Sequence, residues 1–173
     1  MFQKDIFYLP RYRNGKRVNI RQYQIKSYVF SNNNHGVLVG DGLYYQLKLS
    51  KVIAKEYLDY TNQTDEQSKK IGNARFLFFP FDFDPTTTSI IQLVDVLCGF
   101  HKITNIDLTQ FHKFLDSSVK MYDDIAFYEI HKIMKYPKHV IAFLKTILDD
   151  LGIDNLLDKF LSARSNYKIP DWK

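Results

Sequence analysis

The sequence contains very little cysteine and no long apolar run. Cys98 is the single cysteine among 173 residues, so the chain can form neither an internal disulfide nor a zinc site built from cysteines alone. No segment approaches the roughly twenty apolar residues needed to cross a bilayer, and the N-terminal segment has no apolar core of signal-peptide length. We therefore expect a cytoplasmic, intracellular protein that makes no contact with a membrane and is held together by packing.

The sequence also lacks the short motifs by which common enzyme classes are recognised. It contains no phosphate-binding loop, no dinucleotide fingerprint, no nucleophile elbow and no H-E-x-x-H pair. Glu129 and His131 do not have the i, i+3 spacing of helical di-iron sites. We therefore predict no catalytic residue and no cofactor, and we interpret Cys98 as an inert thiol on the apolar face of a helix.

Composition and the absence of linkers favour one domain. Apolar residues make up 45% and aromatic residues 16% of the chain, which is enough for a sizeable core. No internal repeat and no linker rich in Pro, Gly or Ser divides the sequence. We expect a single domain over residues 1–173, with a β-rich basic part at 1–80 and a helical part at 81–173.

Positive charge is concentrated at the N-terminal end. Residues 1–40 contain seven lysines and arginines against one aspartate, a net charge of +6. Residues 41–173 contain 17 basic and 18 acidic side chains, a net charge of −1. The whole excess of the chain, +5, therefore lies in this first segment, which suggests that the segment faces an anionic partner or water.

The basic segment has the pattern of antiparallel strands. Asn14-Gly15 is the sequence of a two-residue type I′ turn, because both residues tolerate positive φ, and the flanking RYR and KRV predict the arms of a hairpin. Further turn residues separate expected strands at 18–30, 37–39 and 43–49. We therefore predict an antiparallel β-meander over about residues 5–49, and one later buried strand at 74–79.

Most of the remaining sequence has helical periodicity. Ser50 is a candidate N-cap for a helix over 50–60, and Asp84-Pro85 predicts the start of a longer helix. Pro137 and Gly152 predict the limits of another helix. Four to five C-terminal helices should therefore pack on the sheet, which makes the fold class α+β. Their expected ranges are about 85–97, 108–122, 123–135, 137–151 and 154–164.

The sharpest local motif is Phe81-Asp82-Phe83-Asp84, directly after the buried strand. In an extended segment the carboxylates of Asp82 and Asp84 would project to the same side and could bind one Mg²⁺ or Mn²⁺ ion, as metal-dependent phosphoryl or nucleotidyl transfer requires. The alternative is that Asp84 caps the following helix while Asp82 lies in solvent. We favour the cap, because D-x-D is a short pattern and helix caps are common.

Two short resemblances to known families include these aspartates. The segment FDFDPTTTS resembles the first motif of haloacid dehalogenase-type phosphatases, and FLFFPFDFD resembles the aspartate pair of archaeo-eukaryotic primases. Pro85 stands where the phosphatases commonly have glycine, and the chain shows no alternation of strands and helices for their parallel sheet. Gly99-Phe100-His101 follows too closely to be the later histidine motif of the primases. We assign the chain to neither family.

The basic N-terminal residues are the candidate nucleic-acid contact. Lysines and arginines could lie along a phosphate backbone, and exposed tyrosines could stack on unpaired bases. Alternation places Arg11 and Arg13 on the face opposite Tyr12, so the tyrosine could instead belong to the core. The alternative is a solvated hairpin whose charges block edge-to-edge aggregation. The predicted contact residues are Arg11, Tyr12, Arg13, Lys16, Arg17, Arg21, Tyr23 and Lys26.

These patterns together favour a non-catalytic binding module. Its partner is predicted to be nucleic acid or else an acidic protein surface, with the helical half as scaffold or protein-contact surface. One alternative is a metal-dependent phosphoryl- or nucleotidyl-transfer enzyme built on Asp82 and Asp84. Another is a protein of the viral or mobile-element type that inhibits or bridges a protein partner.

Overall fold

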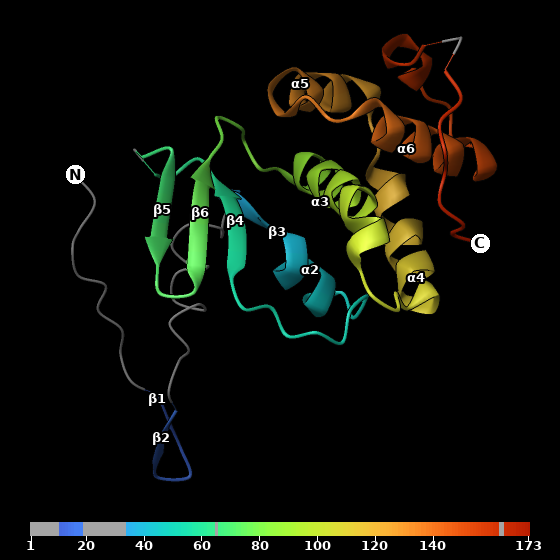
Figure 1. The fold of residues 1–173 in the computed structure, drawn as a ribbon. Helices are drawn as coiled ribbons and strands as arrows, with labels where there is room; N and C mark the ends of the chain where they lie inside the picture. The colour runs from blue at the N-terminus through green and yellow to red at the C-terminus, as the bar shows by residue number, and fades with distance from the viewer. Residues whose placement is uncertain (1–10, 19–33, 65, 163–164) are drawn as a thin grey trace.

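The computed structural model describes residues 11–18, 34–64, 66–162 and 165–173 of the chain. Within these residues, two short strands form one sheet, four strands form a second sheet, and there are five α-helices (Figure 1). This is the α+β fold class that the sequence predicts. None of the described helices is both long and apolar enough to cross a membrane.

The predicted hairpin is present. β1 (Arg11–Arg13) and β2 (Lys16–Val18) pair antiparallel and form the two-stranded sheet. Asn14 and Gly15 have φ values of 52° and 72°, which are the left-handed values that a type I′ turn requires. The asparagine-glycine pair therefore closes the hairpin as predicted. The other expected parts of the meander at 5–10 and 19–33 lie outside the described residues.

The larger sheet is mixed, with the strand order β3-β4-β6-β5. The central pair, β4 and β6, is parallel, while each edge strand runs antiparallel to its neighbour. The strand predicted at 74–79 is confirmed as β6, and its Ala74 and Phe76 are fully buried. The sequence did not predict β4 or β5. The bounds are β3 (Gly36–Val39), β4 (Tyr57–Thr61), β5 (Ser68–Ile71) and β6 (Ala74–Phe78).

The strand predicted over 43–49 is wrong, because helix α2 (Gly40–Gln46) occupies most of this segment. Leu43 and Tyr44 are adjacent and both buried, at 1% and 7% exposure, whereas a strand with one wet face would bury only alternate residues. Gly42 lets the helix approach the sheet, since a Cβ there would lie 2.8 Å from Cδ1 of Tyr57. Packing against β4 therefore favours a helix over the strand that the alternating pattern suggests.

The helix predicted over 50–60 is also wrong. Residues 50–56 are irregular, and Val52 and Ile53 are each 66% exposed. The hydroxyl of Ser50 accepts a hydrogen bond from the N–H of Val52 at 3.1 Å, which stabilises a tight turn and not a helix. Tyr57 then begins β4, because its YLDYT sequence pairs with a strand on either side.

The helical half follows the sequence closely, with four helices at the predicted places. Three of them begin at an aspartate whose carboxylate accepts a hydrogen bond from the backbone N–H three residues later, and Pro137 precedes the fourth. Gly152, with a φ of 69°, follows the end of that helix as predicted. The bounds are α3 (Pro85–Gly99), α4 (Leu108–Ser118), α5 (Asp124–Met134) and α6 (Lys138–Asp150).

The last predicted helix, at 154–164, is shorter than expected. Among its described residues, 154–162, the single 3₁₀ turn η3 (Leu157–Phe160) is the helical part. Asn155 competes with the helix, because its side-chain oxygen accepts from the N–H of Leu157 at 3.3 Å. Leu157 is the fully buried residue of this turn and anchors it to the core.

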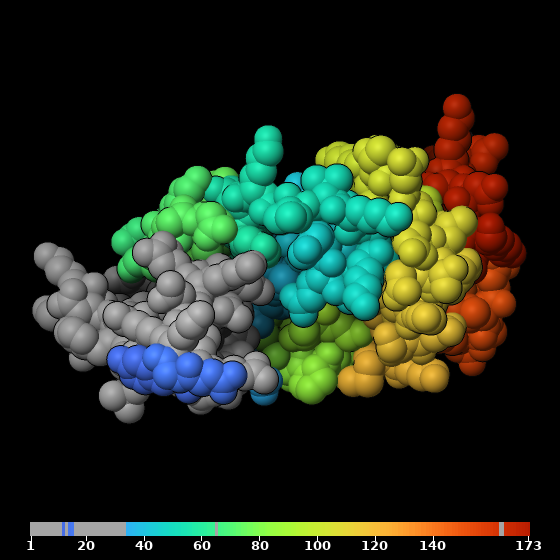
Figure 2. All heavy atoms as spheres, turned by 90° about the horizontal axis from the view of Figure 1, so that it is seen from below, coloured from blue at the N-terminus to red at the C-terminus, as the bar shows by residue number. Residues whose placement is uncertain are grey.

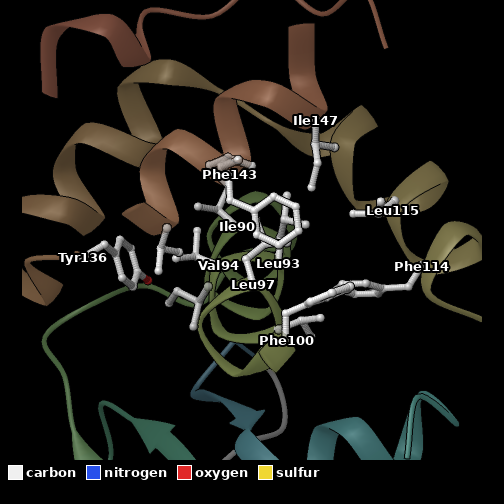
Figure 3. Packing of buried hydrophobic residues seen from close by; sticks show 14 of the residues in the cluster. Ile90, Leu93, Val94, Leu97, Phe100, Phe114, Leu115, Tyr136, Phe143 and Ile147 are labelled. Carbon is white, nitrogen blue, oxygen red and sulfur yellow. The ribbon is translucent and has the colours of Figure 1, made fainter. Parts of the chain in front are cut away.

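Helix α3 is the centre of the core (Figure 3). It packs against the sheet through β3 and against α5 and α6 on other sides. Buried apolar residues such as Ile90, Leu93 and Val96 cover a wide arc of α3. Gln92 and Asp95 lie on the remaining polar stripe, where Asp95 accepts a hydrogen bond from Gly40 and Gln92 donates one to Leu38. One cluster of buried residues therefore extends from Val37 of β3 through Leu93 of α3 to Leu144 of α6.

Candidate functional site

The basic hairpin is a surface feature of the molecule. Tyr12 is 67% exposed, so it does not belong to the core. Asn14 and Gly15 at the tip are exposed as well. In Figure 2 the coloured part of the hairpin, in blue, lies on the surface, away from the C-terminal helices. An exposed aromatic ring in a basic ribbon can stack on an unpaired base.

The structure brings most of the predicted contact residues together. Arg11, Tyr12, Arg13, Lys16 and Arg17 all lie in the described hairpin, where the register pairs Tyr12 with Arg17 and Arg13 with Lys16. They therefore form one short ribbon. Arg21, Tyr23 and Lys26 lie outside the described residues.

Of the two interpretations of Asp82 and Asp84, the structure agrees with the helix cap. Oδ1 of Asp84 accepts a hydrogen bond from the N–H of Thr87 at 2.8 Å, and Oδ2 accepts one from the hydroxyl of Thr87 at 3.2 Å. Asp82 is exposed, so the predicted cap and the predicted solvated residue are both confirmed. Within the described residues, no group of three or more His, Cys, Asp or Glu side chains is placed to hold a metal. A Mg²⁺ or Mn²⁺ site at Asp82 and Asp84 stays a prediction.

A cavity of about 390 Å³ lies between α2 and the C-terminal half of α3. We call it the α2–α3 cavity. It is bounded by the start of α2, by the irregular segment at Ser50 and Val52, and by the turn after α3. Its polar lining includes Asp41, Tyr44, Asp95, Cys98 and Lys102. The volume falls in the range of roughly 300–1,000 Å³ that is typical of small-molecule sites.

Asp95 joins the two helices that form this cavity. Its Oδ2 accepts a hydrogen bond from the N–H of Gly40 at 2.7 Å, and its backbone carbonyl accepts one from the hydroxyl of Tyr44 at 3.0 Å. Val39, the N-cap of α2, makes no side-chain cap of its own, so Asp95 supplies this cap from the neighbouring helix. Gly99 provides the space for the tyrosine ring, since a Cβ there would lie 2.6 Å from Cζ of Tyr44.

Burial controls the acid–base properties of the cavity wall. It raises the pKa of the Asp95 carboxyl, against the opposing effects of the Gly40 amide and the Tyr44 hydroxyl, and the negative charge of Asp41 raises it further. Burial also raises the pKa of the Cys98 thiol to about 11, with a further contribution from the charge of Asp95. The thiol is therefore protonated at neutral pH. It is half-buried and lines the cavity, so a reagent that enters the cavity can reach it.

The sequence does not reveal this cavity. The alternating pattern of residues 43–49 predicts a strand, which would separate Tyr44 from the C-terminal half of α3. The available signal was Asp95 itself, since it is an aspartate within the apolar run of a helix and a buried carboxylate needs partners.

Comparisons with models of known families, with curated proteins and with solved structures found no match to this chain.

Proposed function

We propose that the chain is a non-catalytic binding module that contacts nucleic acid through the β1–β2 hairpin. The observation that carries the proposal is the hairpin itself, a separate two-stranded ribbon with Tyr12 67% exposed. The ribbon belongs to the segment that holds the whole net positive charge of the chain. In this proposal the helical half is a scaffold or a protein-contact surface.

The proposed contact uses charge and stacking together. Lysines and arginines release counterions from a phosphate backbone, which supplies affinity without sequence specificity. Tyr12 supplies a ring face, and stacking of a base on an aromatic side chain tolerates any base. A narrow ribbon of this kind suits single-stranded nucleic acid, because unpaired bases can reach the ring.

Fluorescence anisotropy with labelled single- and double-stranded DNA and RNA tests the proposal, at about 0.15 M salt so that weak surface charges are screened. We expect the Arg13→Glu/Arg17→Glu variant to bind about tenfold or more weakly, because it replaces two phosphate contacts by two repulsive charges. Tyr12→Ala should reduce affinity for single strands by about tenfold and change double-strand binding little.

The matched control is Lys113→Glu/Lys120→Glu, which changes the net charge equally at two exposed lysines of the helical half. Equal loss of affinity in both charge variants would show that only net charge matters and would contradict a hairpin site. Absence of binding to every nucleic acid, with binding to polyglutamate instead, would make an acidic protein the partner and the proposal wrong.

A further inference from the structure

We propose that the α2–α3 cavity binds a small organic cation, an alkylamine or alkylguanidine, with Asp95 as its counter-ion. The site is separate from the hairpin, so the inference does not depend on nucleic-acid binding. It is carried by the cavity, by the charges that line it and by the hydrogen bonding of Asp95.

The lining of the cavity favours a positive ligand. Asp41 and Asp95 contribute two carboxylates against the single ammonium of Lys102. The last turn of α3 contributes partial negative charge to the wall, and the first turn of the shorter helix α2 contributes partial positive charge. The full charges decide the sign, because two carboxylates face one ammonium, so the cavity is locally negative in a chain whose net charge is +5.

Asp95 is half-buried, and among the described residues its carboxylate has no basic side chain beside it to balance its charge. Its side chain accepts the N–H of Gly40 at 2.7 Å. In the part of the chain that the structure describes, no Lys, Arg or His forms an ion pair with it. Burial disfavours its ionised form, and the neighbouring charge of Asp41 adds to this effect. A bound cation would offset both effects, because an opposite charge favours ionisation.

The size and the apolar wall define the rest of the ligand. The volume of about 390 Å³ admits a small molecule or a single side chain and excludes a folded partner. Val52 and Ile103 supply apolar surface beside the carboxylates. An alkyl chain with an ammonium or guanidinium group can contact both kinds of surface.

Cys98 provides a direct reporter, because it is the single cysteine and it lines the cavity. The rate at which a disulfide reagent modifies its thiol is measured with and without agmatine, which is a four-carbon chain with an amine and a guanidine. With agmatine at ten times its Kd, we expect the rate to fall by roughly tenfold, because the free fraction falls by that factor. Uncharged 1,5-pentanediol should not protect the thiol.

Two substitutions test the sign of the charge. Asp95→Asn keeps an oxygen that can accept from Gly40 and should weaken agmatine binding by about tenfold or more, because a charge-assisted contact is lost. Lys102→Gln removes the competing positive charge and should strengthen binding. Asp116→Asn, on the exposed face of α4, is the control and should leave binding unchanged. Calorimetry measures agmatine binding to each variant, and circular dichroism shows whether the variant is folded.

Every outcome bears on the proposal. The proposal is wrong if agmatine at millimolar concentration does not protect the thiol of Cys98. It is also wrong if Asp95→Asn strengthens binding and Lys102→Gln weakens it, because those changes would indicate an anionic ligand. Should Asp95→Asn fail to fold, Asp41→Asn at the exposed rim replaces it with the same expected direction. A blocked Gly-Arg-Gly peptide that protects better than agmatine would assign the cation to a protein side chain and contradict a free small molecule.

Discussion

At the scale of single residues, aspartates have three different roles in this protein. Asp84 closes its own helix by accepting hydrogen bonds from Thr87. Asp95 caps a different helix, because its carboxylate accepts the N–H of Gly40. Asp82 is exposed in the segment before α3. The Asp84-Pro85 sequence indicates the first of these roles, but that of Asp95 depends on which distant backbone amide lies within reach of its carboxylate.

The cap at α3 gives a prediction for Asp84. Asp84→Ala should lower the free energy of unfolding by about 1 kcal/mol, because the N–H of Thr87 loses its acceptor. Asp82→Ala, at an exposed position, should change it by less than about 0.5 kcal/mol. Urea denaturation of both variants measures these differences.

The same two residues allow a test for metal binding. With a cap alone, MgCl₂ should leave the melting temperature of the wild-type protein unchanged. A rise in melting temperature that disappears in Asp82→Asn would instead support the metal site, because a ligand that binds the native state stabilises it.

At the scale of elements, the junction between α5 and α6 depends on one histidine. Nδ1 of His131 accepts a hydrogen bond from the N–H of Tyr136 at 3.1 Å, across a turn in which Lys135 has a φ of 51°. The imidazole ring packs on Phe127 and Phe160, with centroid distances of 5.8 and 4.9 Å. The neutral ring is therefore the form that fits this turn, and burial lowers the pKa of His131 below its usual 6.5.

Because the pKa of His131 is lowered in the folded protein, we predict that the free energy of unfolding decreases in mild acid. Well above pH 6.5 both the folded and the unfolded histidine are neutral. Below it the unfolded chain takes up a proton that the folded chain resists, so the free energy of unfolding falls as pH falls towards the lowered pKa. Urea denaturation at about pH 7.5 and about pH 5.5 measures this slope.

His131→Gln should flatten the slope, because its amide oxygen can accept a hydrogen bond and does not titrate in this range. His139→Gln, at an exposed position of α6, is the control and should leave the slope in place. An unchanged slope in His131→Gln would assign the pH dependence to another group.

At the scale of the whole molecule, α3 joins the sheet to the C-terminal helices. Its buried residues belong to a single cluster that includes β3 and α6, and helix-to-helix and helix-to-sheet contacts meet along its length (Figure 3). Such continuity favours one cooperative unit over two independent halves.

Cooperative unfolding tests this expectation of a single domain. Trp172 is the single tryptophan, is 7% exposed and lies beside His112 of α4, so its fluorescence reports on the helical half. Hydrogen exchange of the amides of β4 reports on the sheet. We expect the two probes to give the same urea midpoint. Two separate midpoints would show that the halves unfold independently.

Sequence alone determined the features that depend on a few neighbouring residues. The Asn14-Gly15 turn, the Asp84 cap and the Gly152 stop are where the sequence predicts them, because each follows from local φ values or from one short hydrogen bond. The buried strand at 74–78 and the four main helices were predicted for the same reason, since their apolar periodicity is strong.

The tertiary structure alone decided the course of residues 40–61 and, with it, the α2–α3 cavity. The alternation of residues 43–49 suits a strand locally, but a helix buries the adjacent Leu43 and Tyr44 together, which a half-exposed strand would not do. The following segment pairs as β4 between β3 and β6, so its backbone groups are hydrogen-bonded on both sides. Asp95 lies more than fifty residues from Gly40 along the chain. Only the packing of α2 on α3 brings the carboxylate to that amide and leaves the cavity beside it.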